Sequence, residues 1–115
     1  MKFSTLSLLS LAAFSSPALA CVQFRLGFNL NANRINAALT DIGNQKCQLH
    51  DKFFSVVGSG YETWVYLSCV SGYEAGIYLA TGEVKYKYGS FEGSFGTTQT
   101  ITDDESIWSA NVWGC

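Results

Sequence analysis

The chain has 115 residues, with seven Lys and Arg against nine Asp and Glu, and a formal net charge of −2 at pH 7. This weakly acidic balance excludes a broad electrostatic hold on nucleic acid or on an anionic membrane surface. The length favours one domain with a modest hydrophobic core.

Residues 1–20 are predicted to be a secretory signal peptide. Lys2 gives a positive start, residues 6–14 form an apolar core, and residues 17–20 provide a cleavage site of mostly small side chains. The apolar core is too short to act as a membrane anchor. We therefore expect a single secreted, extracellular domain at residues 21–115, with a net charge of about −3 because Lys2 is lost.

The mature chain has four cysteines, Cys21, Cys47, Cys69 and Cys115, which in a secreted protein predict two disulfides. No two of them are closely spaced, and His50 is the only histidine, so we predict no metal site and no cofactor. Three pairings are possible. We favour Cys21–Cys115, which would clamp the ends of the mature chain and contribute on the order of 4 kcal/mol, together with Cys47–Cys69.

The mature domain opens with a predicted strand, followed by a predicted helix. Residues 22–28 alternate between apolar and polar side chains, as a half-buried strand does. The apolar side chains that follow are spaced at i, i+3, i+4 and i+7, which is a helical stripe: Ile35, Ala38, Leu39 and Ile42. Gly43 is a suitable stop. We predict one helix at residues 32–42, then a polar connector at residues 44–51.

The rest of the chain has the pattern of antiparallel strands joined by tight turns. Strands are predicted at residues 53–57, 61–70, 73–80, 83–88 and 106–113, with a glycine-aromatic loop at 89–96. Residues 61–70 are apolar on both faces, which favours a central strand covered on both sides. The predicted fold class is therefore α+β, with one helix packed on an antiparallel sheet of about five to six strands and stapled by disulfides.

This order of elements, with His50 and the sequence SGYETW at residues 59–64, resembles the small secreted fungal guanyl-specific ribonucleases. The resemblance implies that Glu62 is the general base and that His50 is the acid or its support. There is no second histidine, and both arginines, Arg25 and Arg34, precede or open the helix segment. Phosphodiester cleavage needs a proton acceptor and a separate donor. We therefore predict no enzymatic activity, with a secreted ribonuclease as an alternative.

Secreted effectors of plant-pathogenic fungi include proteins that keep the ribonuclease-like fold without its catalytic set, and this chain is similar to them. The similarity implies a virulence-associated effector that binds, and can inhibit, a host macromolecule. We expect a monomer with a host protein as partner, no general nucleic-acid binding and no membrane anchor. The predicted binding residues are aromatic, because Tyr and Trp are favoured interface anchors: Tyr73, Tyr78, Phe91, Trp108 and Trp113. The alternative is that these rings fill the core.

A second resemblance involves residues 86–93, YKYGSFEG, followed by ESIWS at residues 105–109. This pattern is similar to one Greek-key motif of the βγ-crystallin family. The resemblance implies an antimicrobial, killer-toxin-like or protease-inhibitor protein. The acidic run at residues 103–105 lacks the spaced ligands and the glycine of a calcium loop, so we interpret it as a solvated turn.

Overall fold

The computed structural model describes residues 21–55 and 61–115. The predicted signal peptide and the predicted turn at residues 58–60 lie outside the described residues. The described part of the chain contains ten strands in two antiparallel sheets and no helix. The α+β prediction is therefore wrong, and the fold is all-β.

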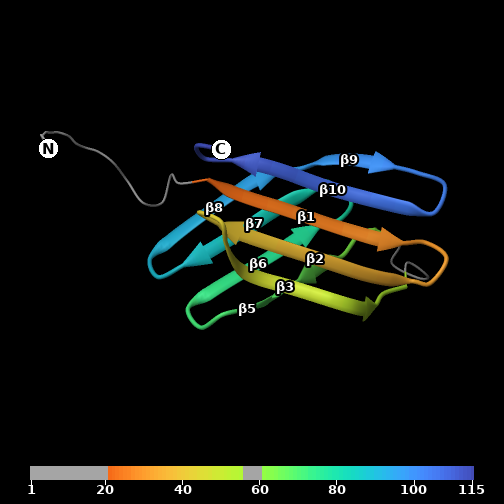
Figure 1. Cartoon of the computed structure of the whole chain (residues 1–115), viewed down its shortest axis with the longest axis horizontal. Helices are drawn as coiled ribbons and strands as arrows, with labels where there is room; N and C mark the ends of the chain where they lie inside the picture. The colour runs from red at the N-terminus through yellow and green to blue at the C-terminus, as the bar shows by residue number, and fades with distance from the viewer. Residues whose placement is uncertain (1–20, 56–60) are drawn as a thin grey trace, which may run out of the picture.

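The larger sheet has six strands in the order β5-β3-β2-β1-β10-β9 (Figure 1). Every neighbouring pair in it is antiparallel. Its strands, in chain order, are β1 (Val22–Asn29), β2 (Arg34–Asp41), β3 (Asn44–Phe53), β5 (Ser68–Cys69), β9 (Thr98–Ile101) and β10 (Glu105–Val112).

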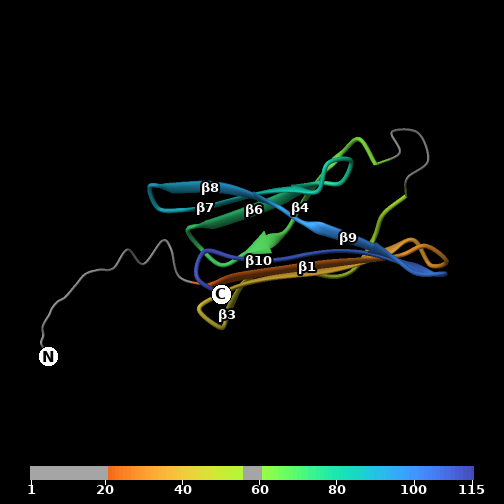
Figure 2. The same ribbon diagram turned by 90° about the horizontal axis from the view of Figure 1, so that it is seen from above.

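The smaller sheet has four strands in the order β4-β6-β7-β8. They are β4 (Trp64–Tyr66), β6 (Tyr73–Tyr78), β7 (Glu83–Tyr88) and β8 (Phe91–Gly96). Figure 2 shows the two sheets as two layers, and Figure 1 shows that their strands run in different directions. One face of each sheet is thereby covered by the other sheet, and one is left to solvent.

The predicted helix at residues 32–42 is replaced by the turn before β2, strand β2 itself and the first residue of the next turn. In β2 the buried side chains alternate and face the other sheet: Ile35, Ala37, Leu39 and Asp41. Strand β2 pairs along its whole length with β1, a partner that the local sequence does not reveal. The helical spacing was misleading because Ala38 and Ile42 are apolar but do not belong to the core.

Gly43, which was predicted to end the helix, lies in a tight hairpin turn between β2 and β3. Ile42 and Gly43 have φ values of 51° and 76°, and Asp41 pairs with Asn44 across the turn. Positive φ at both central residues is the signature of a two-residue hairpin loop. The polar connector predicted at residues 44–51 is consequently strand β3, and that prediction is wrong too.

The predicted central strand at residues 61–70 is divided between the two sheets. β4 is an edge strand of the smaller sheet and β5 is an edge strand of the larger one. Between them lies buried Leu67, whose N–H donates to the carbonyl of Ala75 at 3.0 Å. Only one face of the segment is covered, because Val65 and Leu67 are buried while Tyr66 between them is exposed.

A second segment changes sheets in the same way. β8 lies at the edge of the smaller sheet and β9 at the edge of the larger one, and Figure 2 shows the chain passing from one layer to the other between them. Thr97, between β8 and β9, fixes the position of this connection. Its N–H and its hydroxyl both donate to the carbonyl of Gly82, at 3.1 and 2.8 Å. The glycine-aromatic loop predicted at residues 89–96 is therefore mainly a strand.

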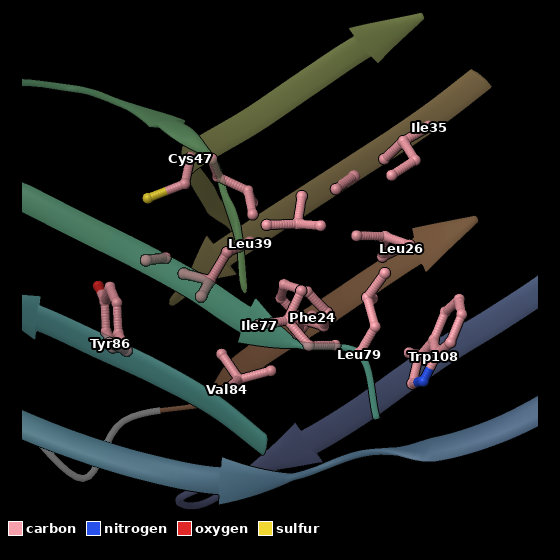
Figure 3. Close-up of a cluster of buried hydrophobic side chains, with 14 of the residues drawn as sticks. Phe24, Leu26, Ile35, Leu39, Cys47, Ile77, Leu79, Val84, Tyr86 and Trp108 are labelled. Atoms are coloured by element: carbon pink, nitrogen blue, oxygen red, sulfur yellow. The ribbon is translucent and has the colours of Figure 1, made fainter. Parts of the chain in front are cut away.

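The core lies between the two sheets (Figure 3). The predicted strand at residues 22–28 is confirmed as β1, and its inward side chains are almost fully buried: Val22, Phe24, Leu26 and Phe28. From the smaller sheet, Ile77 and Val84 pack into the same core. Trp108 of β10 is also there, with only 1% of its surface exposed.

Both predicted disulfides are confirmed. Cys21–Cys115 joins the first and last of the described residues, and Cys47–Cys69 joins directly paired residues of β3 and β5. Two disulfides in a small domain are consistent with an extracellular location. Within the described residues, no helix has the length and apolar character that crossing a membrane requires.

Candidate binding face

The smaller sheet turns one face to solvent, and that face carries aromatic rings. Side chains alternate along β6 and β7, with Ile77 and Val84 pointing into the core. The alternate positions of β6 and β7 therefore point to the opposite, solvent-facing side. Their cross-strand partners on β4 point to that side as well. We call the following residues the outer aromatic face: Trp64, Tyr66, Tyr78 and Lys85.

The three rings of the outer aromatic face lie close to one another. The ring centroids of Trp64 and Tyr66 are 6.2 Å apart, with an interplanar angle of 17°. Tyr78 is the cross-strand partner of Trp64, and their centroids are 5.4 Å apart. The Nζ atom of Lys85 lies 4.9 Å from the centroid of the Trp64 ring, within the range of a cation–π contact.

Tyr66 is the most exposed of these rings, and a glycine determines its position. It pairs with Gly76 on β6, where a Cβ atom would lie only 2.8 Å from Cδ1 of the Tyr66 ring. The ring thus lies over the bare backbone of Gly76, while 69% of the residue remains exposed. A side chain in place of Gly76 would push the ring away from the sheet.

Beside Tyr66 is an open groove of about 420 Å³. Its floor is sheet backbone, and its polar side chains are Glu74, Lys85, Lys87, Glu92 and Ser94. Lys87 and Glu92 form an ion pair at 3.8 Å. Both side chains of this pair are well exposed, so the pair adds little to stability. The groove therefore combines one aromatic wall with positive and negative groups in equal number.

A second group of rings lies on the inner side of the smaller sheet, at one end of the core. We call it the inner aromatic cluster: Tyr73, Tyr86, Tyr88, Phe91 and Trp113. Neighbouring centroids in it are 5.2 to 6.4 Å apart. Trp113 packs over Gly93, where a Cβ atom would lie 2.8 Å from the indole. These rings contact each other and the core.

The inner aromatic cluster is tied to the larger sheet by a buried hydrogen bond. The hydroxyl of Tyr86 donates to Oδ2 of Asp41 at 2.7 Å. Burial, and then the hydrogen bond and charge of Asp41, raise the pKa of Tyr86 well above its ordinary value. Burial, Asp41 and Tyr73 raise the pKa of Tyr88 as well. The other carboxylate oxygen of Asp41 is buried and has no hydrogen-bond partner among the described residues.

The structure separates the five predicted binding residues into three environments. Tyr78 lies on the outer aromatic face. Tyr73, Phe91 and Trp113 belong to the inner aromatic cluster and are only partly exposed. Trp108 is buried, so its prediction as an exposed binding residue is wrong; it contacts Tyr61, with centroids 6.0 Å apart. The reason is that β10 turns this side chain toward the core.

The structure places the two ribonuclease-like positions at different sheets. His50 is exposed on β3 of the larger sheet, and Glu62 is exposed just before β4 of the smaller sheet. No hydrogen bond or ion pair joins them. Within residues 21–55 and 61–115, no group of three or more His, Cys, Asp or Glu side chains could hold a metal ion. The helix on which the resemblance partly depended is a strand.

The sequence alone did not identify Trp64, Tyr66 and Lys85 as candidate binding residues. One signal was present, because Glu74, Lys85, Lys87 and Glu92 alternate with apolar residues and mark one face of β6 to β8 as solvated. What was missing was the pairing of β4 with β6, which places Trp64 and Tyr66 on that same face.

Comparison of the chain with protein-family models, with curated proteins and with solved structures finds no match.

Proposed function

We propose that this protein is a secreted effector that acts by binding a host macromolecule through the outer aromatic face. The observation that supports this most is Tyr66, a large ring that is 69% exposed and lies on a glycine beside two further rings. Single exposed apolar residues are common and need no explanation. Three clustered rings beside a charged groove are typical of a recognition surface.

The surrounding fold supports a binding role because it holds these rings on a regular sheet. β6 and β7 pair over six residues without a register shift, and β7 and β8 do the same. Little backbone ordering is then needed when a ligand binds, which favours affinity. The disulfides Cys21–Cys115 and Cys47–Cys69 suit a domain that must persist among extracellular proteases.

A retention assay tests the proposal. The tagged domain, residues 21–115, is incubated with apoplastic fluid and with cell-wall material from plant tissue. We expect the host material to retain it, and expect the double variant Trp64→Ala, Tyr66→Ala to be retained about tenfold less, the effect of roughly 1.4 kcal/mol. The matched control is Phe53→Ala, which removes a ring that is 61% exposed on the larger sheet.

Urea unfolding of the same variants shows whether a loss of retention is a loss of folding. Phe53→Ala, at an exposed position, should change the free energy of unfolding by about 0.5 kcal/mol or less. The double variant also removes the half-buried ring of Trp64 and should lose more, about 1–2 kcal/mol, but remain folded. Equal retention of the double variant and the wild type would contradict the proposal, as would retention that Phe53→Ala reduces to the same degree.

A further inference from the structure

We infer that the ligand of the outer aromatic face is an uncharged glycan of β-linked pyranose rings with equatorial substituents, such as chains of glucose or N-acetylglucosamine. This inference rests on the proposed function and specifies the chemical class of the macromolecule. It is carried by the shape of the rings, by the polar groups in the groove, and by the size and composition of the face.

The rings suit the flat side of such a sugar. When all ring substituents are equatorial, both faces of a pyranose present C–H groups, whose hydrogens carry partial positive charge. The face of an aromatic ring is negative, so the two surfaces attract and bury apolar area. Tyr66 has one face toward Gly76, and Trp64 lies nearly parallel to it on the same strand. The open face of Tyr66 can therefore contact a sugar unit, with Trp64 and Lys85 beside it.

The groove beside the rings suits the hydroxyl groups at the rim of the sugar. A hydroxyl both donates and accepts, so it is matched by neighbouring donors and acceptors. Lys85, Glu74 and Ser94 supply these, and no hydrogen bond or ion pair to another described residue occupies their side chains. Lys85 and Lys87 are balanced by Glu74 and Glu92 around the groove. This balance favours an uncharged ligand over an acidic or basic one.

The outer face is small for a protein partner. The six-residue strands β6, β7 and β8 and the shorter edge strand β4 span at most roughly 20 Å by 19 Å, a projected area of about 400 Å², at the usual strand spacings. A standard protein interface takes about 800 Å² from each partner and has an apolar centre. The other exposed large apolar residues all belong to the larger sheet or its turns: Ile42, Phe53, Val70 and Ile101. The outer face therefore offers rings and charges but no aliphatic centre.

Titration with defined oligosaccharides, followed by NMR or calorimetry, tests the inference. The probes are cellohexaose and chitohexaose, with β-1,4-mannohexaose as the ligand control, because its axial hydroxyl interrupts one apolar face. We expect binding of at least one of the first two and weaker binding of the third. Tyr66→Ala should weaken binding about tenfold. Tyr66→Phe should retain it, because the ring face is kept, and Phe53→Ala should leave it unchanged.

The inference is overturned if neither cellohexaose nor chitohexaose binds, or if Tyr66→Ala binds them as tightly as the wild type. If these probes fail while a host protein is retained in a Tyr66-dependent way, the glycan inference is wrong and the proposed function stands. If there is neither oligosaccharide binding nor Tyr66-dependent retention, both are wrong.

Discussion

Aromatic rings gather on both sides of the smaller sheet, and the two groups differ in what surrounds them. The inner aromatic cluster packs against the core and is tied to the larger sheet through Tyr86 and Asp41. In the outer aromatic face Tyr66 is exposed and Trp64 and Tyr78 are half-buried, with Lys85 and a charged groove beside them. The inner rings therefore stabilise the contact between the sheets, and the outer rings are available to a ligand. Residue type alone does not distinguish the two roles.

Removing a ring from the core should have the largest effect on stability. Trp108→Ala deletes a side chain that is 1% exposed and leaves a cavity between the sheets. We expect a loss of about 3–5 kcal/mol in the free energy of unfolding, measured in urea. Tyr66→Ala on the outer face is the matched control and should lose about 0.5 kcal/mol or less. A larger loss from Tyr66→Ala than from Trp108→Ala would contradict the distinction between rings in the core and rings on the outer face.

Tyr86→Phe tests the link between the inner aromatic cluster and the larger sheet. The change keeps the ring but removes the hydroxyl that donates to Asp41 at 2.7 Å. A buried carboxylate is then left without its donor, and we expect the free energy of unfolding to fall by about 1–3 kcal/mol. Tyr78→Phe removes the same hydroxyl from the outer face and should change it little. Equal effects of the two substitutions would show that the bond to Asp41 adds nothing.

Because the pKa of Tyr86 is raised, Tyr86→Phe should also change how stability depends on pH. Above pH 10.0, the ordinary tyrosine value, the unfolded chain loses the Tyr86 proton while the folded protein keeps it. The unfolded state then binds fewer protons, so stability falls as the pH rises above 10.0. Tyr86→Phe should show a shallower fall, not a flat profile, because the pKa of Tyr88 is raised too. Unfolding curves between neutral pH and strong alkali measure the slope.

Two glycines give the closest comparison of the inner and outer sides. A Cβ at Gly93 would lie 2.8 Å from the packed indole of Trp113, and a Cβ at Gly76 would lie 2.8 Å from the exposed ring of Tyr66. The inner rings have little room to move, so Gly93→Ala should cost about 1–3 kcal/mol of stability. The Tyr66 ring can swing into solvent, so Gly76→Ala should change stability by less than about 1 kcal/mol. Urea unfolding of both variants shows whether Gly93→Ala loses more stability than Gly76→Ala, as we expect.

Part of this fold was predictable because some patterns are local. The alternation at residues 22–28 and 83–88 gave β1 and β7, since period-two burial depends only on neighbouring side chains. The two disulfides were predicted from an even cysteine count in a chain expected to be secreted, and the favoured pairing, chosen because Cys21–Cys115 would clamp the chain ends, was correct. The effector role, the host partner and export itself remain predictions.

Other features depended on pairing between residues far apart in the chain. Residues 34–41 fit a helical stripe and a strand equally well until β1 is placed beside them. The segment from Trp64 to Cys69 looked like one strand because nothing local shows that it changes sheets at Leu67. In both segments, tertiary packing decided between alternatives that local propensity left open.

For the candidate site, the sequence alone determined the residue types that are available: many aromatic rings, an even number of cysteines, and strands with one polar side. The tertiary structure decided which rings face inward, because the side of a strand that becomes buried depends on the sheet laid against it. That is why Trp108 belongs to the core while Tyr66, on an edge strand opposite a glycine, stays open to solvent.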